Sequence, residues 1–196
     1  MEDALLERWL EDLLATPGLT AIRDPSLARR ALVEDALRAL PLVEAASGPI
    51  VDVGSGGGVP GIPLAIALPH RSFTLLEPVW RKAAFLVRQA ERLGNVEVVR
   101  GRAEEQPLER WGVGLAKALA APPVAAELTL PLVRTGGVAI LWVGATADRA
   151  RVARAAELVG GRLEADAEGL LAVRKVAPTP AGFPRRAGAA RKRPLA

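Results

Sequence analysis

Apolar and polar positions follow a helical period over the first 46 residues. Six apolar side chains share one stripe of the first predicted helix, with acidic residues on its other faces: Leu5, Leu6, Trp9, Leu10, Leu13 and Leu14. A second helix is predicted to begin at Asp24, an N-cap residue, with Pro25 in its first turn. Pro41 and the ASGP run at 46–49 then mark a boundary, so we expect residues 1–46 to form a helical cap.

After this boundary the pattern changes to short apolar runs that alternate with helical stretches. Seven runs are predicted strands, at residues 50–53, 72–76, 96–99, 113–118, 138–143, 162–165 and 170–174. Helices are expected at 60–68, at 80–93 with Gly94 as C-cap, after the prolines at 122–123, and at 147–159. This alternation predicts an α/β domain with a doubly wound parallel sheet over residues 47–176.

The remaining residues, 177–196, are rich in Pro, Gly and Arg, and we expect an irregular basic arm. The net charge is +4, but seven basic residues and no acid lie from Arg174 onward, so residues 1–173 carry a charge of −3. A basic tail on an acidic body favours a polyanionic partner such as nucleic acid, although it can also serve only solubility. The candidate RNA-binding residues are Arg185, Arg186, Arg191, Lys192 and Arg193.

Composition excludes several kinds of chemistry. The absence of cysteine excludes disulfides, thiolate catalysis and Cys-ligated metals, and a single histidine, His70, argues against His-dependent triads. We therefore expect no metal site. The acidic start of the chain is unlike a secretory signal, and no apolar run reaches the roughly 18–20 residues of a membrane span. A soluble, cytoplasmic protein is expected.

The glycine-rich turn after the first strand carries the clearest functional signal. In one register, Gly56, Gly58 and Gly61 fit the G-x-G-x-x-G of a dinucleotide site. In the other, Asp52, Gly54, Gly56 and Gly58 fit the D-x-G-x-G-x-G of S-adenosylmethionine (SAM) enzymes. The second register is favoured, because the first glycine should follow the strand directly. A carboxylate at Asp52 would also repel a pyrophosphate, whereas it suits a ligand with an ammonium and a sulfonium group.

Two later segments fit the same site. Glu77 ends the second strand, where a carboxylate can accept hydrogen bonds from both ribose hydroxyls of SAM or NAD, or can cap the next helix. The segment GRAEE at 101–105 follows the third strand and can meet an adenine through its backbone and Glu104.

Several stretches together resemble the bacterial RsmG family, also called GidB, of 16S ribosomal RNA guanine-N7 methyltransferases. They are DVGSGGGVPGIPLAI at 52–66, LTAIRDP at 19–25, GRAEE at 101–105, TPAGFPRRAG at 179–188 and PL at 194–195. The resemblance implies a helical N-terminal cap on a Rossmann-like methyltransferase domain with a seven-stranded, mostly parallel sheet. It implies SAM as cofactor and the small ribosomal subunit or its 16S rRNA as partner, and we expect a monomer.

The resemblance also implies which residues hold SAM. It places Gly54 and Val59 of the turn, Glu77 at the ribose and Ala103 with Glu104 near the adenine, and it aligns a family arginine with Lys117. With the turn itself, the candidate cofactor residues are Asp52, Gly54, Ser55, Gly56, Gly58, Val59, Glu77, Ala103, Glu104 and Lys117. Because the basic arm lies outside this set, we expect its removal to leave SAM affinity nearly unchanged.

Five positions depart from the family pattern at polar places that can face the substrate: Gly18, Leu32, Lys117, Val143 and the pair Glu168-Gly169. Guanine N7 carries a free lone pair, so no general base is required and no catalytic residue is assigned. Trp80 and Trp142 are candidates to stack on a base, although tryptophan is more often part of a core. Two alternatives stay open, namely a relative that binds SAM and RNA without efficient methylation, and a nucleotide-dependent oxidoreductase.

Overall fold

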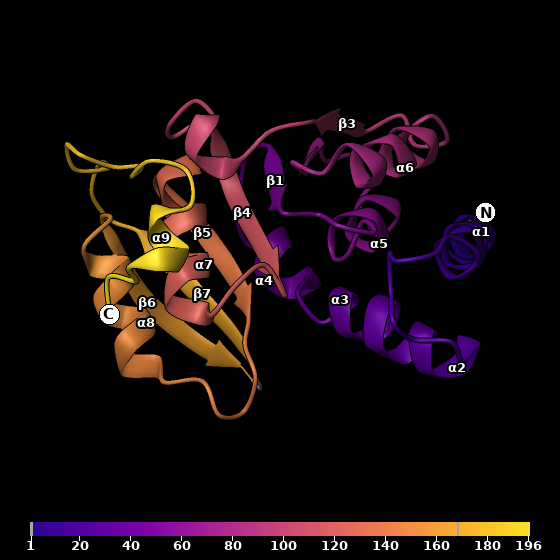
Figure 1. Cartoon of the computed structure of the whole chain (residues 1–196), viewed down its shortest axis with the longest axis horizontal. Helices are drawn as coiled ribbons and strands as arrows, with labels where there is room; N and C mark the ends of the chain where they lie inside the picture. Colours follow the sequence, from indigo (N-terminus) through magenta and orange to yellow (C-terminus); the bar gives the residue numbers. More distant parts are fainter. Residues whose placement is uncertain (1, 168) are drawn as a thin grey trace.

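A seven-stranded sheet runs through the computed structural model, which describes residues 2–167 and 169–196 (Figure 1). The strands are β1 (Ile50–Val53), β2 (Phe73–Leu76), β3 (Val96–Val99), β4 (Trp111–Lys117), β5 (Val133–Trp142), β6 (Gly161–Ala167) and β7 (Leu170–Lys175). Their order is β3-β2-β1-β4-β5-β7-β6, with β7 antiparallel to both of its neighbours and the other pairs parallel. The predicted α/β class and mostly parallel seven-stranded sheet are confirmed.

Helices cover both faces of the sheet, which is why the central strands are continuous apolar runs. They are α1 (Glu2–Ala15), α2 (Pro25–Ala28), α3 (Asp35–Leu37), α4 (Leu40–Glu44), α5 (Gly61–Ala67), α6 (Trp80–Ala90), α7 (Pro122–Thr129), α8 (Arg149–Glu157) and α9 (Ala189–Lys192). Leu64 of α5 packs on one face with Ile50, and Ala156 of α8 packs on the other with Leu141. Among the described residues, no helix is both long and apolar enough to span a membrane.

The second predicted helix is correct at its start and wrong in its continuity. Asp24 caps α2 by accepting a hydrogen bond from the Leu27 backbone N–H. The chain then widens into a π-helical turn, η1 (Arg29–Glu34), before α3. Pro41 does not end the helical segment, because it lies in the first turn of α4, where its missing N–H leaves no bond unmade.

Helix α6 ends earlier than the sequence pattern indicates. Its last residue is Ala90 and its C-cap is Glu91, so Gly94 lies beyond the helix and does not adopt the left-handed conformation of a glycine cap. The strand β3 that follows is an edge strand, only partly buried.

The C-terminal arm is more ordered than an irregular tail. Residues 188–192 include the single-turn helix α9, whose Ala190 is 2% exposed and packs with Val53 and Leu128. In Figure 1 this segment, drawn in yellow, lies beside α7. The arm is anchored there by Arg185, whose Nε and Nη2 each donate to a carboxylate oxygen of Glu127 at 2.6 Å. Glu127 is 3% exposed, so this ion pair is part of the packing.

Candidate functional site

The glycine turn between β1 and α5 adopts backbone angles that glycine alone tolerates well. Gly54, Gly56 and Gly58 have φ of 74°, 59° and 96°. At Gly54 a Cβ would also lie 2.5 Å from a methyl carbon of Leu119, so a side chain there would require Leu119 to shift. The turn therefore presents bare backbone at the carboxyl end of β1, the edge at which α/β sheets bind ligands.

Asp52 supports the turn from below. Its side chain is 1% exposed and its Oδ2 accepts a hydrogen bond from the Gly61 N–H at 3.1 Å, while Ser55 Oγ donates to the Asp52 carbonyl. Burial raises the pKa of Asp52 to about 7, aided by the nearby Glu77 charge and opposed by hydrogen bonds. The motif predicts Asp52 as a charge that faces the ligand, but the structure places its carboxylate inside the protein, where it orders the turn.

Glu77 holds the same turn from the side. Its Oε2 accepts from the Gly56 N–H at 2.9 Å and its Oε1 accepts from the Val79 N–H at 2.8 Å, and the side chain is 4% exposed. The carboxylate thus satisfies its neighbours' backbone and keeps lone pairs at the carboxyl end of β2. Both interpretations made from the sequence, ribose acceptor and cap, are compatible with this position.

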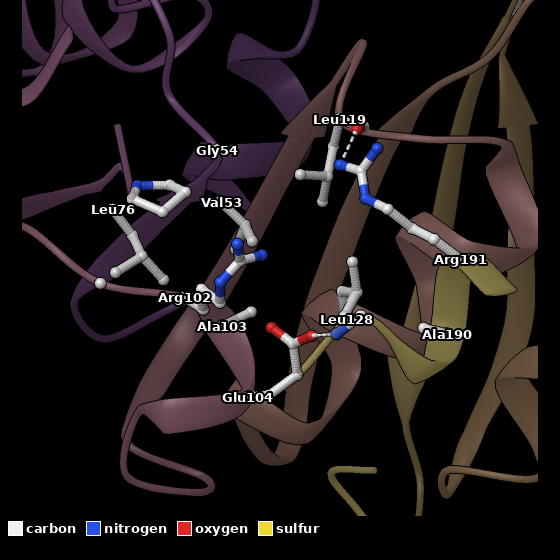
Figure 2. Close-up of a pocket in the computed structure, with 13 residues that line it drawn as sticks. Val53, Gly54, Leu76, Arg102, Ala103, Glu104, Leu119, Leu128, Ala190 and Arg191 are labelled. Carbon is white, nitrogen blue, oxygen red and sulfur yellow. Dashed lines mark hydrogen bonds between the residues drawn. The ribbon is translucent and has the colours of Figure 1, made fainter. Parts of the chain in front are cut away.

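Two hollows lie on either side of the turn and share Gly54. The first is lined by Val53, Ala103, Glu104 and Leu119 as well as Gly54, and Figure 2 shows these side chains around it. Its free volume is only about 50 Å³. The second, of about 270 Å³, is lined by candidate residues Ser55, Gly56, Val59 and Lys117, together with Leu32 and Lys82. Seven of the ten predicted cofactor residues line one or both hollows, and Asp52, Gly58 and Glu77 do not.

The C-terminal arm forms one wall of the first hollow, which the sequence analysis missed. The Gly188 N–H donates to Glu104 Oε1 at 3.0 Å, and Arg191 Nη2 donates to the Leu119 carbonyl at 2.8 Å (Figure 2). Glu104 is thus already engaged by the arm. No local sequence pattern predicts these two contacts, because they join residues that are 84 and 72 positions apart.

This geometry divides the five candidate RNA residues. Arg185 forms an ion pair with Glu127, and Arg191 donates to the Leu119 carbonyl, so an RNA contact of either residue stays a prediction. Arg186, Lys192 and Arg193 are exposed and stay candidates for RNA.

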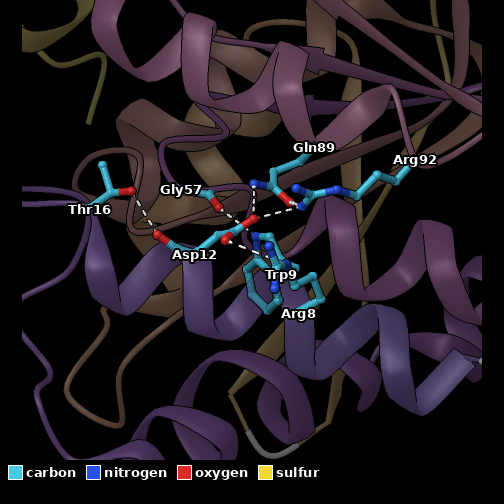
Figure 3. A network of polar contacts seen from close by, with 7 residues as sticks. All are labelled: Arg8, Trp9, Asp12, Thr16, Gly57, Gln89 and Arg92. Atoms are coloured by element: carbon cyan, nitrogen blue, oxygen red, sulfur yellow. Dashed lines mark hydrogen bonds and ion pairs between the residues drawn. The ribbon is translucent and has the colours of Figure 1, made fainter.

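Helix α1 also contributes to the turn through Trp9, a residue the sequence indicated only as packing. Trp9 is 2% exposed, and its Nε1 donates to the Gly57 carbonyl at 3.0 Å (Figure 3). Next to it, Asp12 Oδ2 accepts from Gln89 of α6 and from Arg92. These hydrogen bonds lower the pKa of Asp12. The helical cap therefore holds the turn as well as covering the domain.

A third hollow adjoins the second and collects the positions that depart from the family pattern. Lys117 and Ala118 line both hollows, and Val143 and Gly169 line the third. Glu168 lies outside the described residues. Leu32 lines the second hollow and Gly18 lies against the guanidinium of Arg81, so the departures surround the site.

The two candidate stacking tryptophans lie in different surroundings. Trp80 is 68% exposed at the start of α6, whereas Trp142 is half-buried and lines the third hollow.

The chain matches a family model over residues 5–162, and that family is GidB, rRNA small subunit methyltransferase G. The chain belongs to the GidB family. Relatives named ribosomal RNA small subunit methyltransferase G include one from Synechococcus sp. strain JA-3-3Ab, 40% identical over 92% of this chain and 79% of its own. Another, from Rubrobacter xylanophilus, is 40% identical over 76% and 66%.

Solved structures with the same fold share much less sequence with this GidB member. The T. thermophilus 16S rRNA N2 G1207 methyltransferase, solved with AdoMet and guanosine, has a TM-score of 0.57 and is 18% identical over 84% of this chain and 42% of its own. A Burkholderia thailandensis N1-methyltransferase with S-adenosylhomocysteine has a TM-score of 0.59 at 14% identity, over 89% of both chains. These structures confirm the predicted fold class, a Rossmann-like α/β domain, and the family model with the relatives above confirms the family predicted from the sequence motifs.

Proposed function

We propose that this protein transfers a methyl group from SAM to N7 of a guanine in 16S ribosomal RNA. The observation that carries the proposal is the turn at 54–58, with Glu77 beside it, in a chain of the GidB family. We further propose that it acts as a cytoplasmic monomer. We also propose that it needs no metal ion, since transfer to a nitrogen lone pair requires neither a base nor a Lewis acid.

The residues present fit SAM along the two joined hollows. Glycines with positive φ bring backbone close to the ligand at Gly54 and Gly56, and Glu77 can accept from ribose hydroxyls. The hollow beside Ala103 and Glu104 suits the adenine. Lys82 and Lys117 both line the larger hollow. Lys82 offers an ammonium group for the carboxylate of the methionine part, whereas Lys117 donates to Asp35.

The chemistry asked of these residues is positioning. SAM supplies an electrophilic methyl group on a sulfonium, and the protein must hold guanine N7 in line with the methyl–sulfur bond and exclude water. The free volume of the first hollow is only about 50 Å³, so we expect an adenine that enters it to displace side chains or the arm.

The proposal is tested by radiolabelled methyl transfer from SAM to small ribosomal subunits and to naked 16S rRNA, followed by nucleoside analysis. We expect 7-methylguanosine as product. Incorporation into neither substrate, with SAM binding verified by calorimetry, would contradict an enzymatic function and favour a SAM- and RNA-binding relative. Binding of NAD in place of SAM would favour the dinucleotide alternative.

A further inference from the structure

The third hollow lies next to the second hollow, which we call the cofactor cleft, and it has the composition of a base-binding pocket. It has a volume of about 330 Å³ and is lined by Asp35, Arg38, Lys117, Ala118 and Trp142, among others. Lys117 and Ala118 form its shared wall with the cleft. Ala118 has a φ of 53°, a strained conformation for a residue with a side chain, and such strain concentrates at functional sites.

Asp35 brings a carboxylate into this hollow from the N-terminal segment. Its Oδ2 accepts from Lys117 Nζ at 2.5 Å, and its Oδ1 accepts from Arg38 Nη1 at 2.8 Å. The Trp142 indole N–H donates to the Asp35 carbonyl at 3.1 Å, which fixes α3 against the end of β5. The Asp35 side chain keeps 27% of its surface exposed, so each oxygen retains acceptor capacity toward the hollow.

The charges in the hollow hold this carboxylate ionised. Burial alone would raise the pKa of Asp35, but the hydrogen bonds and positive charges of Lys117 and Arg38 outweigh burial and lower it. Asp35 is therefore a fixed acceptor at neutral pH, next to a fixed donor.

The order of these groups matches the two edges of guanine. For methylation at N7, the edge with N7 and O6 must face the cofactor cleft, and the edge with N1–H and the 2-amino group then points away from it. Lys117, a donor, lines both the cleft and the hollow, whereas Asp35, an acceptor, lines only the hollow. A donor thus lies on the side of the O6 acceptor, and an acceptor lies on the side of the N1–H and 2-amino donors.

We propose that this hollow receives the target guanine, with Asp35 accepting hydrogen bonds from its N1–H and 2-amino group and Lys117 donating to its O6. The inference rests on the proposed function. Adenine would meet the wrong group at both edges, since its N1 accepts and its 6-amino group donates. During transfer the purine ring becomes positively charged, so the ionised Asp35 also interacts more strongly with the transition state than with the substrate.

The test uses the full chain loaded with S-adenosylhomocysteine. GMP, IMP and AMP are titrated into it separately, and NMR measures the affinity for each. IMP differs from GMP only in lacking the 2-amino group. Because a hydrogen bond to a charged acceptor is lost with that group, we expect IMP to bind roughly tenfold or more weakly than GMP. AMP should bind more weakly still. Equal affinities for GMP and IMP, or no GMP binding, in the parent protein would overturn the inference without any variant.

Two matched variants break the same ion pair from opposite sides. Asp35→Asn should reduce the ratio of the GMP affinity to the IMP affinity toward one. Lys117→Met should weaken the binding of both nucleotides by a similar factor, since both carry O6. If the ion pair only tethers the N-terminal helices to the sheet, the two variants will lower stability alike and leave the ratio at its parental value. That result also overturns the inference.

Methyl transfer by the parent protein separates this inference from the proposed function. Absence of transfer to ribosomal RNA would refute the function itself. Production of 7-methylguanosine together with equal GMP and IMP binding would refute only the role of Asp35. If the role is correct, Asp35→Asn should reduce the turnover rate on rRNA and leave the Kd for SAM within about twofold of the parent value.

Discussion

At the residue scale, Glu77 has two roles, and Glu77→Gln weakens both because the amide nitrogen cannot accept from a backbone N–H. Its carboxylate fixes the Gly56 and Val79 N–H groups and is the proposed ribose acceptor. Glu77→Gln keeps one acceptor oxygen but removes the charge, so SAM affinity should fall by about 1.5–3 kcal/mol, or roughly tenfold to over a hundredfold. Calorimetry with SAM measures this. A folded Glu77→Gln variant with parental affinity would remove Glu77 from the ribose site.

Asp52 gives the protein a pH dependence of its own. Its pKa rises from 3.8 in the unfolded chain to about 7 in the folded one, so between these values the folded protein holds a proton that unfolding releases. Stability from this group is therefore present at pH 4 and is lost as the pH rises through 7. The side chain in Asp52→Asn cannot ionise, so this variant does not lose that stability as the pH rises.

The free energy of unfolding of Asp52→Asn minus that of the parent should therefore increase between pH 4 and pH 8, by about 1–4 kcal/mol. Urea unfolding at four pH values measures the difference, in which contributions from other groups cancel. A difference that stays constant with pH would show that Asp52 titrates normally in the folded state.

At the scale of elements, the arm and the domain depend on each other through Arg185. Arg185→Ala leaves the 3%-exposed carboxylate of Glu127 without its partner, which should cost about 1–3 kcal/mol of stability. Because the same segment walls the first hollow, SAM affinity should also fall, by a few-fold at least. This reverses the expectation from charge alone that the arm is dispensable for SAM.

A matched control lies in the same arm. Replacing the exposed Arg186, Lys192 and Arg193 together by alanine should leave both the melting temperature and SAM affinity unchanged. It should instead flatten the dependence of log K for RNA on log salt by about 2–3 units. If Arg185→Ala binds SAM with the affinity of the parent, the arm does not contribute to cofactor binding.

Which elements the sequence predicted follows from how local their causes are. The central strands β1, β2 and β4 were predicted because buried parallel strands are apolar runs, and the turn because glycine spacing is a local signal. The π-helical break at η1, the arm wall and the position of Asp35 beside Lys117 were not predicted. The arm wall and the position of Asp35 depend on contacts between residues far apart in the chain, the second across 82 positions.

At the scale of the whole molecule, three separate parts of the chain meet at the glycine turn. Helix α1 reaches it through Trp9, the sheet through Asp52 and Glu77, and the arm closes the adjoining hollow at Glu104. A ligand bound there should therefore slow local opening of all three at once. With saturating SAM, hydrogen exchange should slow in residues 185–191 and around Trp9 as well as in the turn.

The β6–β7 hairpin provides the internal control, since it forms the far edge of the sheet. Its exchange should change little on SAM binding. Slowing confined to the turn, with the arm unaffected, would show that the arm wall is not coupled to the cofactor.

The arm wall also has a consequence for biosynthesis. Ribosomes make the chain from its N-terminus, so the segment of the glycine turn leaves the ribosome before residues 185–191 do. Until Arg185 finds Glu127, the nascent protein has the turn but lacks one wall of the hollow beside it. If the arm wall supports the cofactor site as proposed, we expect firm SAM binding only after residues 185–191 have docked on α7.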